Sequence, residues 1–182
     1  MKTAMESLRL TAILALLMGL APAALAQEGS DEDEYAPELP SMEIYKAMLD
    51  ANKKPGWVQF RNYAGKQIIY FTALQTMRCR LSEVRYSINS DALDRNFPLG
   101  DCDPQQPYNI PADDPGGRFI YLTLKPGEAR TISVQAVWAD GSGSEIVTYR
   151  PCDNVGDSTC TRIKTIKKPT QLDAPTPPSQ SR

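Results

Sequence analysis

From Trp57 to Tyr149 the chain alternates strand-length segments with short turns rich in glycine and proline, and no helix-length repeat separates these segments. Val84, Tyr86 and Ile88 are apolar at every second position, which places one side of a strand in an apolar core. Short strands joined by turns indicate antiparallel pairing in a sandwich or barrel. The sequence therefore predicts an all-β fold.

About six strands are predicted in this part of the chain. Their ranges are 57–62, 67–74, 79–89, 119–124, 131–139 and 145–149. Segment 67–74 is apolar enough to be buried on both faces. In 79–89, Cys79 and Leu81 are out of phase with the apolar residues that follow, which indicates either a β-bulge at 82–83 or a strand covered on both sides.

The last predicted hairpin, VQAVWADGSGSEIVTY, resembles the final two strands of immunoglobulin and fibronectin type III domains, and VRYSIN resembles a central strand of such sandwiches. The resemblance covers about 70 residues and lacks the Cys…Trp…Cys arrangement of antibody domains. It implies an antiparallel immunoglobulin/fibronectin-like β-sandwich, and it implies no activity. The whole chain also resembles small exported proteins of Gram-negative bacteria.

A short helix is predicted over 41–54, before the strands. Ser41 follows Pro40 and suits an N-cap, and Pro55-Gly56 ends the helix. Four apolar residues recur on one helical face: Met42, Tyr45, Met48 and Leu49. We expect this face to pack on the domain itself; the alternative is a helix that binds a partner.

Residues 1–26 have the three parts of a cleavable signal peptide. Lys2 and Arg9 supply positive charge, 10–20 is an uncharged apolar run, and 24–26 (Ala-Leu-Ala) fits a cleavage site. The apolar run is shorter than the roughly 20 residues that cross a bilayer. We therefore expect a periplasmic protein that is soluble after cleavage and has no transmembrane segment.

The rest of the chain divides into a middle part and two ends of biased charge. Residues 27–40 form an acidic linker without a basic residue, and 161–182 form a basic tail rich in proline and serine. Both ends are predicted to be disordered because they contain few large apolar residues. A single β-sandwich domain is predicted over 41–160. The basic tail has an alternative role, in which it contacts anionic lipid or wall polymer.

The four cysteines are Cys79, Cys102, Cys152 and Cys160. An even number of cysteines in an exported chain indicates disulfide bonds, because that compartment oxidises thiols. We favour the pairs Cys79–Cys102 and Cys152–Cys160, since each closes a short loop. A zinc site is the weaker alternative, because the sequence has no C-x-x-C pair and no histidine.

Residues 89–118 contain five prolines and no predicted helix or strand, which makes them unusually long for a loop in a compact domain. We expect Cys102 to pin this loop to Cys79. Four of its apolar residues are available to cover an end of the core: Phe97, Leu99, Tyr108 and Ile110. The alternative is a loop that contacts a ligand or partner.

The absence of histidine from the sequence removes Ser-His-Asp and Cys-His nucleophile systems and most catalytic zinc sites. Catalysis by two carboxylates remains as an alternative. The candidate acids lie in the long loop: Asp91, Asp94, Asp101, Asp103, Asp113 and Asp114. Segment 153–157 offers oxygen ligands but lacks the spacing of a calcium loop. We therefore expect no enzymatic activity, no metal and no cofactor.

Four arginines are candidates for one exposed, cationic sheet face. They are Arg61, Arg78, Arg80 and Arg85. If the apolar residues of the strand pattern face inward, these guanidiniums face outward and could bind carboxylate or phosphate groups of a partner. The alternative is that they only keep the sheet soluble and discourage edge pairing.

Together these features predict a non-catalytic, exported binding or protein-interaction module that contacts an envelope protein or polymer. A net charge of −2 gives no support for nucleic-acid binding. Two alternatives remain open. One is a carboxylate-dependent enzyme that acts on cell-envelope glycans, and the other is a structural envelope protein whose ends space two layers.

Overall fold

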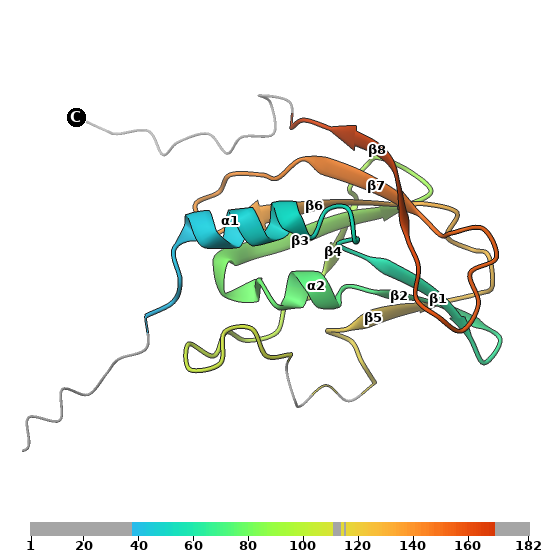
Figure 1. The fold of residues 1–182 in the computed structure, drawn as a ribbon, viewed down its shortest axis with the longest axis horizontal. Helices are drawn as coiled ribbons and strands as arrows, with labels where there is room; N and C mark the ends of the chain where they lie inside the picture. The colour runs from blue at the N-terminus through green and yellow to red at the C-terminus, as the bar shows by residue number, and fades with distance from the viewer. Residues whose placement is uncertain (1–37, 111–113, 115, 170–182) are drawn as a thin grey trace, which may run out of the picture. The chain divides into compact units, whose positions relative to one another are not determined.

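The computed structural model of the chain describes residues 38–110, 114 and 116–169 (Figure 1). They form two antiparallel β-sheets with few helices, which confirms the predicted all-β fold. The three-stranded sheet has the order β1 (Gln59–Tyr63), β2 (Lys66–Tyr70), β5 (Tyr121–Leu124). The five-stranded sheet has the order β4 (Arg95–Phe97), β3 (Leu81–Ile88), β6 (Ile132–Trp138), β7 (Ile146–Arg150), β8 (Arg162–Lys167). The helices are α1 (Met42–Ala51), α2 (Thr72–Gln75) and a 3-10 turn, Arg78–Arg80.

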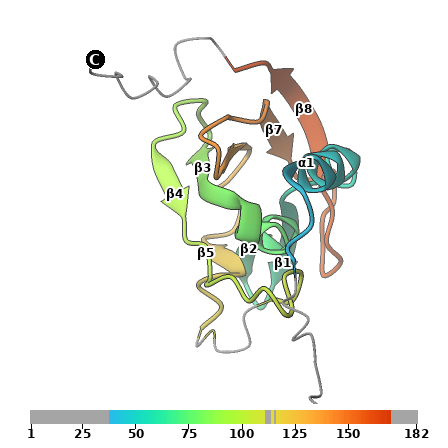
Figure 2. The ribbon, with the colours of Figure 1, turned by 90° about the vertical axis from the view of Figure 1, so that its left-hand side faces the viewer.

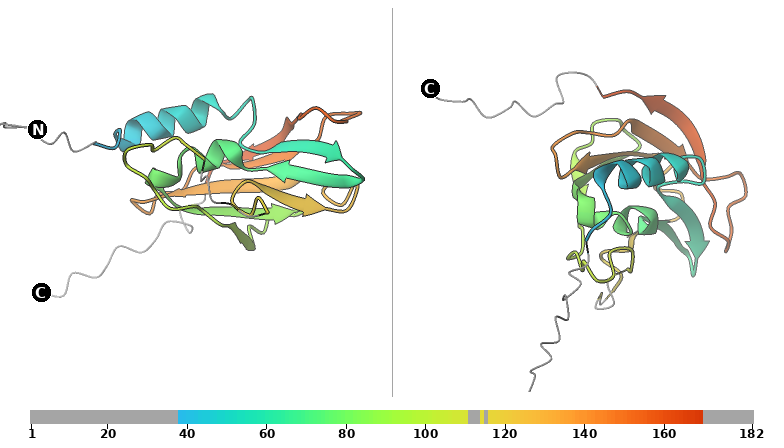
Figure 3. Two further views of the ribbon diagram at one scale, coloured as in Figure 1. Left: turned by 90° about the horizontal axis from the view of Figure 1, so that it is seen from below. Right: turned by 60° about the vertical axis from the view of Figure 1, so that its left-hand side comes forward.

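The apolar core lies between the five-stranded sheet and a second layer made of the smaller sheet and the two α-helices (Figures 2 and 3). Both layers contribute fully buried side chains, among them Tyr45, Phe60, Ile69, Leu74, Val84, Val134, Val147 and Tyr149. Each large apolar side chain removed from water stabilises a fold by about 1.5–3 kcal/mol. The predicted every-second-residue pattern is thus the pattern of this core.

Strand β6 is buried on both faces. Its polar residues Ser133 and Gln135 point away from the apolar core and are covered by two loops. Ser133 Oγ donates to Asp91 Oδ1 at 2.8 Å, and Gln135 Nε2 donates to the carbonyl oxygen of Ser144 at 3.2 Å. These hydrogen bonds offset the cost of burying polar groups on the outer side of the sheet.

Strand β2 is shorter than the predicted strand over 67–74, and its burial on only one face differs from the prediction. It ends at Tyr70, and α2 follows. Gln75, at the end of α2, is fully buried; its side chain donates to the carbonyl oxygen of Pro98 and accepts from the amide of Gly100. The helical turn therefore places the Gln75 side chain where it can form hydrogen bonds with backbone groups of the long loop.

The phase change near Leu81 is a β-bulge, as one of the two predicted alternatives requires. Leu81 pairs with Trp138 and Glu83 pairs with Val137, so two residues of β3 advance against one of β6. Cys79 is outside the strand, in the 3-10 turn.

Two strands were not predicted, β4 and β8. The second one corrects the predicted boundary at residue 160, because Arg162–Lys167 of the predicted disordered tail pair with β7 along the whole of β8. The predicted signal peptide, most of the acidic linker and the last part of the basic tail lie outside the described residues.

Both predicted disulfide pairs are present, Cys79–Cys102 and Cys152–Cys160. The first pins the long loop to the 3-10 turn, as expected. Within this loop Phe97 is buried and stacks on Phe71 with a centroid distance of 4.0 Å. The prediction that the loop covers an end of the core is confirmed for this residue and for Leu99, which packs against the core.

Helix α1 packs on the domain through the predicted face. Tyr45 and Leu49 are buried, and the chain after the helix is fixed by Trp57, whose Nε1 donates to the carbonyl oxygen of Leu49 at 2.8 Å. The Trp57 ring meets Tyr149 of β7 edge-on, and Tyr149 Oη donates to the carbonyl oxygen of Lys53 at 2.9 Å. No helix among the described residues is long and apolar enough to cross a membrane.

Candidate functional site

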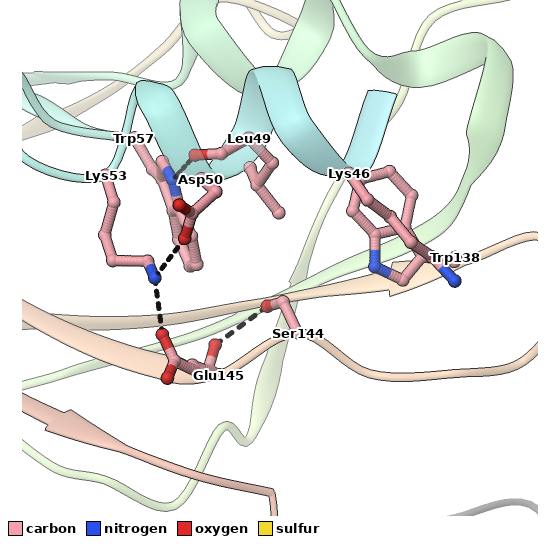
Figure 4. A pocket seen from close by; sticks show the side chains of 8 residues that line it. All are labelled: Lys46, Leu49, Asp50, Lys53, Trp57, Trp138, Ser144 and Glu145. Atoms are coloured by element: carbon pink, nitrogen blue, oxygen red, sulfur yellow. Dashed lines mark hydrogen bonds and ion pairs between the residues drawn. The ribbon is translucent and has the colours of Figure 1, made fainter. Parts of the chain in front are cut away.

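Two adjoining hollows, which share Asp50 and Lys53, form a groove between α1 on one side and the end of β6, the β6–β7 turn and β8 on the other. We call it the α1 groove. The smaller hollow has a volume of about 220 Å³, and we call it the closed end of the groove for its size alone; it is lined by Lys46, Leu49, Asp50, Lys53, Trp57, Trp138, Ser144 and Glu145 (Figure 4). The larger hollow, the open end, has a volume of about 670 Å³ and is lined by Asp50, Lys53, Lys54, Thr161, Arg162, Ile163 and Ile166. Asp50 and Lys53 belong to both ends and mark their boundary.

The closed end has apolar walls and a lysine at its far side. Trp57 and Leu49 come from the α1 side, and Trp138 comes from the end of β6. The Nζ of Lys46 lies 5.8 Å from the ring centroid of Trp138, within the range of a cation–π contact.

Lys46 is held by the turn between β6 and β7. Its Nζ lies 2.9 Å from Asp140 Oδ2 and 3.2 Å from Ser142 Oγ. Hydrogen bonds from Ser142 and then from Lys46 lower the pKa of Asp140 to about 2, so this carboxylate stays ionised at neutral pH. Ser142 Oγ donates to Asp140 Oδ1 at 2.6 Å, so this hydroxyl belongs to the same local network of polar contacts.

Lys53 lies between two carboxylates at the boundary of the groove. Its Nζ is 2.5 Å from Asp50 Oδ1 and 2.6 Å from Glu145 Oε2 (Figure 4). These contacts, first to Asp50 and then to Glu145, raise the pKa of Lys53. A pair of carboxylates in a glycosidase leaves room for the glycosidic oxygen between them, whereas an ammonium fills that place here.

The open end exposes the core side of β8. Ile163 pairs with Tyr149 and Ile166 pairs with Val147, and both partners are core residues, so the two isoleucines face the same side of the sheet. Their spacing of three residues, rather than two, results from a bulge at Lys164. Ile166 is 47% exposed and lines the same hollow as Asp50, Lys53 and Lys54. We call these two isoleucines the β8 apolar face.

Strand β8 is also the last strand of its sheet, so one of its edges has no neighbouring strand among the described residues. Basic side chains surround this edge. They are Lys54, Arg162, Lys164, Lys167 and Lys168, all exposed. Arg162 lies 3.8 Å from Asp153 and Lys167 lies 2.6 Å from Asp91.

The four arginines of the predicted cationic face do not share one sheet face. Arg61 is on β1 of the smaller sheet and contacts Asp157, whereas Arg85 is on β3 and contacts Glu83. Arg78 is buried, and Arg80 donates to the carbonyl oxygens at 39 and 40. Residues 78–80 form a 3-10 turn, so the alternation of a strand does not apply to them. Anion binding by these residues stays a prediction.

The acids of the long loop serve different local contacts. Asp91 accepts from Ser133, Thr148 and Lys167, and its contact with Lys167 is the first cause of its lowered pKa. Asp114 accepts from a backbone amide at the start of the next turn. Asp113 lies outside the described residues. In segment 153–157 the two aspartates form ion pairs with arginines.

No protein-family model matches the chain, and no curated protein or solved structure matches it either. The groove is not predicted from the sequence, because it joins α1, the β6–β7 turn and β8, which are remote in sequence. Two signals are present in the sequence: lysines at 46 and 53, seven residues apart in the predicted helix over 41–54, and the isoleucines of the basic tail.

Proposed function

We propose that the chain is a non-catalytic, exported binding module that holds an extended segment of another envelope protein at the open end of the α1 groove. The observation that carries this proposal is the β8 apolar face, in which Ile166 is 47% exposed beside a strand edge that no strand of the described residues pairs with. An apolar surface next to a free edge suits a partner strand, which gains hydrogen bonds from the edge and burial from the side chains.

The closed end of the groove supports binding rather than catalysis. Its two lysines are each paired with carboxylates, and the pKa shifts of Lys53 and Asp140 favour the charged forms. Acid/base catalysis at neutral pH requires a group that gives or takes a proton near that pH. The groove instead offers fixed charges and tryptophan walls, which suit recognition.

The proposed location outside the cytoplasm rests on the predicted signal peptide and on the disulfides. Two disulfide bonds are compatible with an exported protein, because oxidised pairs persist in oxidising compartments. We also propose an immunoglobulin-like relationship for the sandwich, supported by the antiparallel hairpin of β6 and β7. An experimental structure with its strand connections traced would test that relationship.

Site-specific photo-crosslinking in producing cells tests the proposed function. A photoreactive residue in place of Ile166 is expected to give one dominant adduct with an envelope protein, and Ile166→Ser is expected to weaken binding of the identified partner by about tenfold through lost apolar contact.

Ile44 provides the matched control, because it is 50% exposed but lies on α1 outside the groove. A photoreactive residue at this position should not give the same adduct, and Ile44→Ser should leave the affinity unchanged. Equal adducts from both positions, or no adduct from either position, would contradict the proposal.

A further inference from the structure

We infer that the segment bound at β8 is an extended strand in which apolar and acidic residues alternate, and that it adds to the free edge of β8. This inference rests on the proposed function and specifies the chemistry of the partner. It follows from three features of β8: the free edge, the apolar inner side and the cationic outer side.

The free edge determines the conformation of the partner. β8 is paired with β7 on one side only, and the segment that precedes it turns toward the smaller sheet, where Cys160 and Phe60 exchange backbone hydrogen bonds of 2.9 and 3.3 Å. The backbone of Arg162–Lys167 is thus left with one row of amide and carbonyl groups that no other strand of the described chain pairs. An added strand satisfies such a row.

The inner side of β8 favours an apolar residue at every second position of the partner strand. Side chains of neighbouring strands that point to the same face pack together. The inner side chains of an added strand would continue the β8 apolar face over the open end of the groove, where Ile163 and Ile166 already line a hollow of about 670 Å³. Apolar residues at alternate positions fill this space and bury Ile166.

The outer side of β8 favours acidic residues at the alternate positions of the partner strand. Lys164 and Lys167 line a separate hollow of about 290 Å³ together with Thr148 and Thr165, on the side of the sheet away from the core. Lys164 forms no ion pair with any described residue, whereas Lys167 contacts Asp91. Carboxylates on the outer side of an added strand would lie next to these ammonium groups.

The same lysines argue against a second copy of this chain as the occupant. Pairing of two β8 edges would bring the lysines of both copies onto one sheet face, and like charges on neighbouring strands are destabilising. An acidic strand would instead place carboxylates next to these lysines. The exposed edge of β8 therefore disfavours pairing with a second copy and favours a partner strand of opposite charge.

Three blocked peptides of about eight residues test the inference against the full chain. One alternates Val and Glu, one alternates Val and Gln, and one alternates Val and Lys. Titration calorimetry should show that the Glu peptide binds at least about tenfold more tightly than the Gln peptide, and that the advantage shrinks when NaCl rises from about 20 to about 300 mM. Hydrogen exchange should slow in Arg162–Lys167 when the Glu peptide is bound.

Lys164→Glu is expected to remove the preference for the Glu peptide, while Lys66→Glu, at an exposed strand lysine of the smaller sheet, should leave it unchanged. Equal affinity for all three peptides, no binding of any of them, or binding without slower exchange in β8 would overturn the inference. The proposed function would survive each of these results, because crosslinking at Ile166 tests it separately. Loss of the crosslink together with retained binding of the Glu peptide would instead reject the proposed envelope partner.

Discussion

At the scale of single residues, Arg78 shows how one buried charge organises the long loop. Its side chain is only 6% exposed. The guanidinium donates to the carbonyl oxygens of Asp101 at 2.6 Å, Gln75 at 3.2 Å and Pro107 at 3.4 Å, and also to that of Asn109. These acceptors belong to the end of α2 and to the long loop, so one side chain satisfies groups that would otherwise be buried without donors.

We expect Arg78→Met to lower the free energy of unfolding by about 2–4 kcal/mol, because the substitution leaves several buried carbonyl groups without a donor. Urea denaturation under oxidising conditions measures this loss. Arg95→Met is the control, since Arg95 is exposed on β4, and its effect should stay within about 0.5 kcal/mol. Equal effects of the two substitutions would show that the carbonyl contacts of Arg78 contribute little.

Alternation extended back from β3 through Cys79 predicts an exposed Arg78, whereas the chain forms a 3-10 turn there. Alternation predicts orientation only within a continuous strand. The burial of Arg78 depends on a loop that folds back from residues 101–109, and no local pattern in the sequence contains that information.

At the scale of elements, two lysines join α1 and the turn after it to the β6–β7 connection. Lys46 contacts Asp140, and Lys53 contacts both Asp50 and Glu145. Leu49 and Trp57 fill the space between these two points. The helix is thus fixed by apolar packing at its centre and by ion pairs at both ends, which keeps the groove open in a defined position.

The ion pair at Asp140 predicts a dependence on pH. The folded-state pKa of Asp140 is about 2, against an ordinary value of 3.8. A lowered pKa means that this group stabilises the fold above pH 3.8 and that the contribution is lost as the pH falls toward 2. The side chain is 45% exposed, so we expect a contribution below about 1 kcal/mol.

Asp140→Asn is therefore expected to lower the free energy of unfolding slightly at neutral pH and to have a clearly smaller effect near pH 2. Denaturation curves recorded across this pH range measure the difference between the two proteins. Asp94→Asn is the control, because Asp94 is exposed and forms no side-chain hydrogen bond or ion pair with another described residue; its free energy of unfolding should stay within about 0.5 kcal/mol of the wild type. A constant difference between wild type and Asp140→Asn down to pH 2 would contradict the assignment.

Elements whose sequence signal lies within one short segment are predicted correctly. The helix, predicted over 41–54 and present as α1 over Met42–Ala51, has its apolar stripe within ten residues, and the bulge in β3 is a change of phase within one strand. β8 was missed because a bulge at Lys164 breaks its alternation and because basic residues dominate its composition. Its strand conformation depends on pairing with β7, which is a contact between separate segments.

At the scale of the folded unit, the chain joins its two sheets at the edge next to β8. Asn62 donates its backbone N–H to the carbonyl oxygen of Gly156 at 2.9 Å, and Phe60 pairs with Cys160. The chain then crosses to β7 and begins β8 at Arg162. The disulfide Cys152–Cys160 closes the loop at this crossing, so it restrains the start of the proposed binding edge.

The two disulfides are therefore expected to differ in their effects when each pair is replaced by serine. Loop entropy gives a loss of about 3.4 kcal/mol for the Cys79–Cys102 pair, with a separation of 23 residues, and about 2.5 kcal/mol for the Cys152–Cys160 pair, with a separation of 8. Only the second replacement should speed hydrogen exchange in Arg162–Lys167 beyond the change in global stability, because only that bridge lies at the crossing into β8. Urea denaturation and hydrogen exchange on both variants separate the two effects. If exchange in β8 follows global stability equally in both variants, then the crossing does not position the edge, and the partner strand must order β8 itself when it binds.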